Sequence, residues 1–283
     1  MNIALKSSGD RKTKFRENQR NTYGLLPGPE GTCPMATTGQ GGCRCVKPGR
    51  KNPTCYVYNI MTAYGAVKGV LAHNTDLLKS LTIKDKTKTL AAEFKRFRDI
   101  ELKQKEPQLF YRIHWAGDIY DEDYLIALQA AISEFPDITF WCYTRTLPFA
   151  EWLAASTPNL ILYYSLDKAN LLPGLQAYFN AKGSLKYGGN LQICYMSEKD
   201  DFNEMYQRAY EQNELANILV KFTPGYTPAG HAICTGVWDK DPPKLRSCPV
   251  DEGKLNTEFG CSKCRSCVNK KAGWKPTAVW FKS

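Results

Sequence analysis

Short apolar runs alternate with helical patterns through the middle of the chain. Five apolar runs predict buried strands, at residues 109–115, 138–144, 160–165, 191–196 and 217–222. The stretches between them carry apolar residues at helical spacing and predict helices at 121–134, 148–156, 172–180 and 199–212. Alternating strands and helices build a parallel sheet through right-handed crossovers. We therefore predict an α/β fold, with a parallel (β/α) barrel or partial barrel favoured over an open doubly wound sheet.

The pattern divides the chain into three regions. Residues 1–52 are rich in Gly, Pro, Thr, Asn and charge and predict an irregular N-terminal segment that its cysteines hold together. Residues 53–235 are the barrel-like core, which begins with helices at about 53–72 and 90–105. Residues 236–283 form a cysteine-rich, metal-binding C-terminal segment that ends in a strand-like run.

Polar side chains follow the first three strands of the core. In parallel α/β folds the carboxyl ends of the strands carry the chemistry, so these residues are expected to meet at one rim. Each of them alone is explained as well by helix capping or by solvent exposure. As a group they predict a substrate cavity whose catalytic candidates are His114, Asp118, Tyr143, Arg145, Ser165 and Asp167.

Three positions near this rim have further properties that suit a site. Arg145 presents a planar guanidinium that would hold a carboxylate or a phosphate. Gly117, the second candidate for cofactor binding beside Arg145, gives a small-residue turn that lets the backbone approach a bound group. His114 suits a general base, a metal ligand or a buried core residue, and the sequence leaves these three roles open.

Eleven cysteines are more than a core needs, and most of them fall into two groups. The C-terminal group combines a C-x2-C-x2-C run with a remote cysteine before proline, and consists of Cys248, Cys261, Cys264 and Cys267. Four thiolates at this spacing predict a metal site, either an iron–sulfur cluster or zinc. The N-terminal group is more loosely spaced, and consists of Cys33, Cys43, Cys45 and Cys55. It predicts a second metal site, with a disulfide or unrelated thiols as the alternative.

Charge and hydropathy limit the partners. The net charge is +10 and the pI about 9.0, but the lysines and arginines are spread along the chain, so a polyanion partner stays open. No apolar run approaches the roughly 20 residues that span a bilayer, and the first twenty residues lack the apolar core of a signal peptide. We expect a cytoplasmic protein without a membrane partner.

Several stretches resemble the gene-product-eighty-eight type of phage proteins. They are "NTYGLLPGPEGTCPMAT", "RIHWAGDIYDEDYLIAL", "ITFWCYTRTLPF" and "CPVDEG" with "CSKCRSC", and they lie within residues 21–270. That family is similar in outline to radical S-adenosylmethionine barrels, a variety of TIM barrel. The resemblance implies an iron–sulfur protein, with a 4Fe-4S cluster, encoded by a phage or prophage and acting in the host cytoplasm.

The resemblance also assigns residues to the family's motifs. Cys33 and Cys55 stand at its first and last N-terminal cysteines, with Cys43 or Cys45 between them. The "H…GD" positions are His114, Gly117 and Asp118, and the "YTR" positions are Tyr143 and Arg145. This chain departs from the family's pattern by an insertion, "RCVKPGRKNPT".

We therefore expect an iron–sulfur protein that performs radical or redox chemistry on an unidentified small molecule or nucleic acid. Three N-terminal ligands would leave one iron open for S-adenosylmethionine, whereas four would exclude it. The alternative is a zinc-stapled basic module that binds nucleic acid without catalysis.

Overall fold

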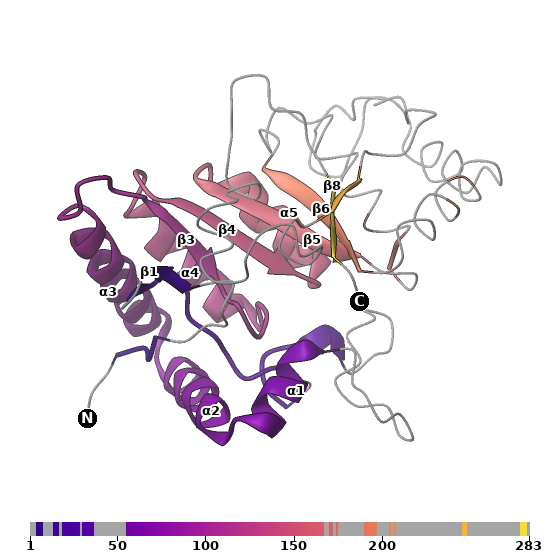
Figure 1. Cartoon of the computed structure of the whole chain (residues 1–283), viewed down its shortest axis with the longest axis horizontal. Coiled ribbons are helices and arrows are strands. Elements are labelled where there is room, and N and C mark those ends of the chain that lie inside the picture. Colours follow the sequence, from indigo (N-terminus) through magenta and orange to yellow (C-terminus); the bar gives the residue numbers. More distant parts are fainter. Residues whose placement is uncertain are drawn as a thin grey trace.

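The protein is built around a parallel sheet, which Figure 1 shows with its covering helices. The computed structural model describes residues 4–7, 14–16, 19–28, 30–36, 55–166, 170–171, 174, 190–196, 204, 207, 245–247 and 278–281. The middle strands are β3 (Phe110–Ile113), β4 (Thr139–Thr144), β5 (Leu160–Leu166) and β6 (Leu191–Met196). Two short strands follow, β8 (Ala278–Phe281) and then β7 (Leu245–Ser247), and every neighbouring pair is parallel. The predicted parallel α/β architecture is confirmed.

The sheet of the described residues is open. Its hydrogen-bonded order runs β3-β4-β5-β6-β8-β7, and no pairing within the described ranges joins β3 to β7. The closed form of the predicted barrel is therefore not what this part of the chain forms, because closure requires a pairing between the two end strands. The predicted strand at 217–222 and the bulk of the helices at 172–180 and 199–212 lie outside the described residues.

The N-terminal segment contributes backbone pairing that its composition did not predict. Residues 21–25 run alongside β3 in parallel, with an isolated bridge between Thr22 and Arg112. The amide of Trp115 donates to the carbonyl of Tyr23 at 3.0 Å, and the amide of Leu25 donates to the carbonyl of Ala116 at 2.8 Å. Before this stretch, β1 (Lys14–Arg16) pairs antiparallel with β2 (Gln19–Arg20). Residues 21–25 therefore act as an extra edge of the sheet.

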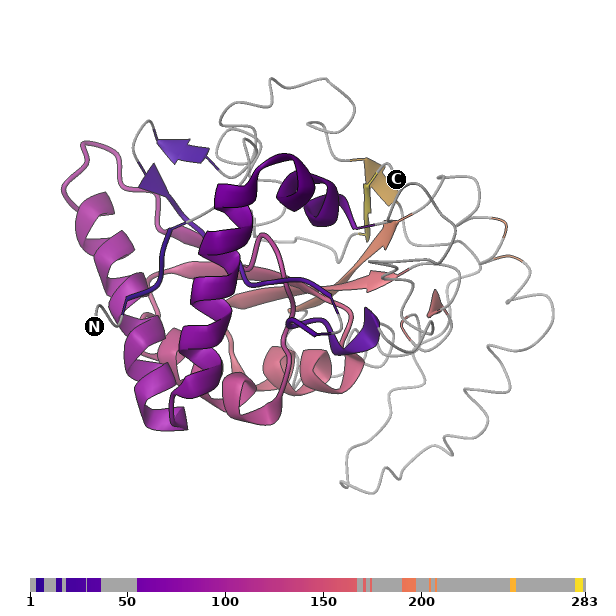
Figure 2. The ribbon, with the colours of Figure 1, turned by 90° about the horizontal axis from the view of Figure 1, so that it is seen from below.

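Two helices cover this N-terminal edge, α1 (Tyr56–Ala63) and α2 (Gly65–Ser80). In Figure 1 they lie below the sheet, and Figure 2 views them from that side. The sequence predicts one helix over 53–72, but the chain leaves the helical conformation at Tyr64, which has φ −131° and ψ 90°. No helix in the described ranges combines the length and the apolarity needed to cross a bilayer.

The other three helices form a layer on one face of the sheet: α3 (Ile83–Glu101), α4 (Glu122–Ser133) and α5 (Leu147–Ser156). Phe94 of α3 anchors this layer, with ring centroids 5.2 Å from Tyr111 and 4.8 Å from Phe140. Because side chains alternate along a strand, Tyr111 and Phe140 point to the helices while their neighbours Arg112 and Trp141 point to the opposite face. We call that opposite side the helix-free face, since these three helices do not cover it.

Candidate functional site

Cys33 ends a tight turn that follows the edge segment 21–25. Gly28 adopts a φ of +100°, which a residue with a side chain rarely tolerates, and its carbonyl accepts the amides of Gly31 and Cys33, both at 3.1 Å. The amide of Thr32 donates to the carbonyl of Leu26 at 2.9 Å. Cys33 is 7% exposed and leads directly into a short 3-10 helix, η2 (Pro34–Ala36). The thiol therefore lies on a rigid turn at the carboxyl edge of the sheet.

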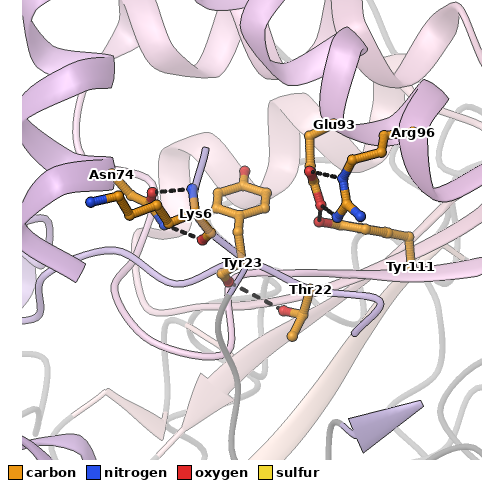
Figure 3. Close-up of polar contacts among 7 residues, drawn as sticks. All are labelled: Lys6, Thr22, Tyr23, Asn74, Glu93, Arg96 and Tyr111. Carbon is orange, nitrogen blue, oxygen red and sulfur yellow. Dashed lines mark hydrogen bonds and ion pairs between the residues drawn. The ribbon is translucent and has the colours of Figure 1, made fainter. Parts of the chain in front are cut away.

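Helix α2 holds this turn through polar side chains. The hydroxyl of Thr75 accepts the amide of Leu26 at 2.8 Å, and Nζ of Lys79 donates to the carbonyl of Gly31 at 2.7 Å. Nearer the sheet, the buried amide of Asn74 donates to the carbonyl of Gly24 at 3.0 Å. The same side chain exchanges two hydrogen bonds with the backbone of Lys6, as Figure 3 shows. These hydrogen bonds fix the turn to α2 independently of any ligand.

Cys55 lies on a second segment that packs against the same turn. It is the N-cap residue of α1, and it packs with Leu26 against a small apolar cluster that includes Trp115. A Cβ built on Gly28 would lie 3.6 Å from the ring of Tyr58, one turn into α1. The segments that carry Cys33 and Cys55 are therefore packed together, although 22 positions separate the two residues in the sequence.

The other predicted ligands are not tested by the structure. Six cysteines of the two groups and one catalytic candidate lie outside the described residues: Cys43, Cys45, Cys248, Cys261, Cys264, Cys267 and, as the catalytic candidate, Asp167. Among the described residues alone, no three His, Cys, Asp or Glu side chains are grouped so that they could hold a metal ion. The two cysteines of the apolar runs, Cys142 and Cys194, are buried.

Asp118 is a hydrogen-bond acceptor inside the protein. Its Oδ1 accepts the hydroxyl of Thr144 at 2.5 Å and the amide of Ile119 at 2.7 Å, while its Oδ2 accepts the amide of Arg145 at 2.9 Å. Its own amide donates to the hydroxyl of Thr32, at 3.2 Å. Asp118 thus bonds the end of β4 through its carboxylate and the cysteine turn through its backbone amide.

His114 is a buried core residue with unusual backbone geometry. Its φ is +52°, its side chain is 2% exposed, and its Nε2 hydrogen-bonds the hydroxyl of Tyr124. That hydroxyl in turn bonds the hydroxyl of Tyr23, at 2.5 Å. Burial, followed by the charge of Arg112, lowers the pKa of His114 to about 3, so the imidazole is neutral at physiological pH. Its Nδ1 is buried without a hydrogen-bond partner in the structure.

Three other candidates gather on the helix-free face. Tyr143 and Tyr163 pair in register and stack with centroids 5.0 Å apart, and the guanidinium of Arg112 lies 5.2 Å from the Tyr143 ring. Ser165 Oγ lies 3.1 Å from Cys194 Sγ. Burial raises the pKa of Cys194 to about 11, and the charges of Arg145 and Arg112 oppose that rise.

The predicted residues thus form two groups. His114 and Asp118 lie between the helix layer and the cysteine turn, whereas Tyr143, Arg145 and Ser165 gather toward the helix-free face. Sequence reasoning missed Arg112. Its signal was available in the run "FYRIHW", where a charged residue alternates with apolar ones inside a strand.

Comparison with known proteins places the chain in a family. Residues 4–270 match the family model described as Gene product 88. The chain belongs to the Gene product 88 family. Two Gene product 88 relatives are the "Gene 88 protein" of Mycobacterium phage D29, 36% identical over 153 residues, and that of Mycobacterium phage L5, 36% identical over 155 residues. Each match covers 53% of this chain. The chain spans 58% and 59% of the length of these relatives, and no solved structure matches it.

Proposed function

We propose that this Gene product 88 protein is an iron–sulfur protein whose N-terminal cysteines hold a 4Fe-4S cluster at the carboxyl edge of the sheet. The ligands would be Cys33, Cys55 and one or both of Cys43 and Cys45. One observation carries the proposal. The two described cysteines lie on segments that pack against each other directly after the parallel edge segment 21–25. In parallel α/β folds this edge is where ligands bind.

The surroundings of Cys55 suit a negatively charged group. Backbone N–H groups at the N-terminus of a helix favour anions, and Cys55 caps α1, whose first turn carries no acidic residue. The apolar cluster around Trp115 would limit access of water to that side. If three cysteines bind, one iron stays open to S-adenosylmethionine. If four bind, that cofactor is excluded.

The remaining parts of the proposal follow from the same architecture. The scaffold would be a partial (β/α) barrel resembling that of radical S-adenosylmethionine enzymes, with its helix-free face toward the substrate. Tyr143, Arg145, Ser165 and Asp167 would contact an unidentified substrate of radical or redox chemistry, with Arg145 holding an anionic group. The C-terminal cysteines would bind a second metal, as a cluster or as zinc.

Anaerobic purification followed by iron and acid-labile sulfide analysis tests the proposal. We expect iron, sulfide and visible charge-transfer absorption in the wild-type protein. Cys33→Ser and Cys55→Ser should lose the part of the iron, sulfide and absorption that the N-terminal cluster contributes. Cys142→Ala is the matched control, because Cys142 is a buried core residue of β4 and should leave the iron content unchanged. Zinc without acid-labile sulfide would overturn the proposal. Binding of nucleic acid that weakens steeply with salt would then favour the zinc-stapled module.

A further inference from the structure

The turn that carries Cys33 is joined to the end of β4 through a single acidic residue. We infer that Asp118, acting through Thr32, is a positioning residue that fixes the Cys33 turn, and not a group that reacts with substrate. The inference rests on the proposed function only where it takes Cys33 to be a metal ligand. The placement of the turn can be tested without any metal.

The first half of the connection is made by Thr32, whose side chain bonds in both directions. Its hydroxyl accepts the amide of Asp118 at 3.2 Å and donates to the carbonyl of Leu26 at 2.9 Å. Thr32 is completely buried and directly precedes Cys33. Losing the hydroxyl would remove both hydrogen bonds and take from the buried amide of Asp118 its acceptor on the turn, which is costly, whereas the carbonyl of Leu26 would keep the amide of Thr32.

The second half is made by the Asp118 carboxylate. Both of its oxygens accept hydrogen bonds within the protein, from Ile119, Thr144 and Arg145. Hydrogen bonds to an ionised carboxylate are stronger than neutral ones. Protonation of the carboxylate would weaken these three hydrogen bonds, because they are stronger to the ionised group. Its hydrogen bonds therefore suit a fixed acceptor rather than a proton carrier.

Gly117 allows the loop that contains Asp118 to approach the Cys33 turn closely. A Cβ at this position would lie 2.5 Å from Oγ1 of Thr32 and 2.7 Å from Cβ of Leu25, distances at which a neighbour must shift. The φ of Gly117 is +84°, which also disfavours a side chain. Two separate requirements thus select glycine where Asp118 reaches Thr32.

One residue consequently sets the distance between the cysteine turn and the backbone of Arg145. In the proposed function, Cys33 holds the cluster and Arg145 anchors the substrate. A shift of the turn would then change the distance between the cluster on Cys33 and the substrate on Arg145, without altering any group that reacts.

Alkylation of Cys33 in the full-length protein purified in air, mapped by mass spectrometry, tests the inference. Thr32→Val removes the hydroxyl and keeps the shape, whereas Thr32→Ser retains the hydroxyl. We expect Cys33 to react roughly five- to thirtyfold faster in Thr32→Val, the factor for one or two lost hydrogen bonds, and at nearly the wild-type rate in Thr32→Ser. Thr157→Val is the matched control, since Thr157 is equally buried but lies before β5.

Cys142 in the core of β4 is the internal reference, because it becomes reactive only when the fold opens. Faster reaction of Cys33 alone supports the inference. Equal acceleration of Cys33 and Cys142, or no acceleration of Cys33, overturns it. Iron analysis of the same variants after anaerobic purification separates the two proposals. A mobile Cys33 turn in a protein whose wild type holds no iron supports the positioning role and overturns the cluster.

Discussion

At the scale of single residues, the most consequential feature is a histidine that is buried in its neutral form. The pKa of His114 is lowered from 6.5 to about 3 in the folded protein, chiefly by burial and further by the charge of Arg112. Between these two values the unfolded chain binds a proton that the folded chain does not. Stability is therefore complete above pH 6.5 and falls as the pH is lowered through this window.

His114→Asn should remove much of this acid sensitivity. Asparagine tolerates the positive φ of the position and carries no titrating group. Denaturant unfolding between pH 6.5 and about pH 4 should show the wild type losing roughly 3 kcal/mol more than the variant. His73→Gln, which replaces a less buried histidine of α2, is the control and should retain the wild-type dependence. Parallel curves for wild type and His114→Asn would show that this histidine is not the cause.

The sequence located these candidates but not their partners. The strand pattern placed His114 and Asp118 after the first strand of the core, as the structure confirms. The roles of both depend on contacts that no local pattern contains. Asp118 bonds Thr32, which is 86 positions away, and His114 bonds Tyr124 across the start of α4. A histidine at a strand end therefore gave no sign of whether it faced a cavity or the core.

At the scale of elements, α3 is fastened to the sheet by a buried carboxylate. Glu93 is 5% exposed and receives two hydrogen bonds from Arg96, at 2.9 and 2.7 Å, and one from the hydroxyl of Tyr111, at 2.9 Å (Figure 3). Tyr111 of β3 is fully buried, and burial together with the charge of Glu93 raises its pKa, so it stays a phenol that can donate.

Glu93→Ala should destabilise the protein by roughly 2–3 kcal/mol, because the Tyr111 hydroxyl would be left buried without its acceptor. Adding Tyr111→Phe to that variant should recover part of the loss, since the orphaned hydroxyl is then removed. A double-mutant cycle by denaturant unfolding measures the coupling. Lys95→Ala, which breaks an exposed ion pair on the same helix, is the control and should change little. Strictly additive losses would rule out the coupling.

The strength of each local pattern decided which elements were predictable. The four strands β3 to β6 were predicted because each is a short, mostly apolar run that is rich in aromatic and aliphatic residues. The edge segment 21–25 was missed because it is short and interrupted by Gly24. That glycine has a tertiary cause, since a Cβ there would lie 2.4 Å from Nε1 of Trp115.

At the scale of the whole molecule, the two groups of cysteines are expected to differ in role. The C-terminal four can saturate one metal and act as a structural staple, because the "CSKCRSC" run has almost no apolar residues of its own. Of the N-terminal group, Cys33 and Cys55 lie at the edge of a sheet that has its own core, which includes residues of β3, β4 and β5. Removing a metal there should leave that core intact.

Cys264→Ser should therefore lower the thermal stability or the soluble yield, whereas Cys55→Ser should abolish a cluster's absorption and leave the protein largely folded. Metal content and thermal unfolding, measured on both variants, decide between the roles. If Cys55→Ser unfolds the protein while Cys264→Ser changes neither stability nor metal content, the two roles are reversed.

The parallel α/β architecture was predictable from the alternation of strand-like and helical segments alone. Membership of the Gene product 88 family agrees with the motifs that the sequence shares with that family. Closure of the sheet was not predictable. A sheet opens or closes according to which strands pair at its two ends, and in the described part of this chain those strands, β3 and β7, lie about 130 residues apart. Apolar periodicity reports which side of a strand is buried, not which strand is its neighbour.

The pairing of residues 21–25 with β3 also sets an order of events during synthesis. The side chain of Asn21 bonds the carbonyl of Phe110, 89 positions later in the chain. At translation rates of roughly 5–20 residues per second, the first-made segment waits about 5 to 20 seconds for its partner to be made. Until Asp118 has been synthesised, Thr32 lacks its hydrogen bond from the amide of Asp118. The Cys33 thiol is then accessible to oxidants and metal ions in the cell. In the proposed function, a cluster would therefore be inserted only after the segment that contains Asp118 has been synthesised and has folded onto the turn.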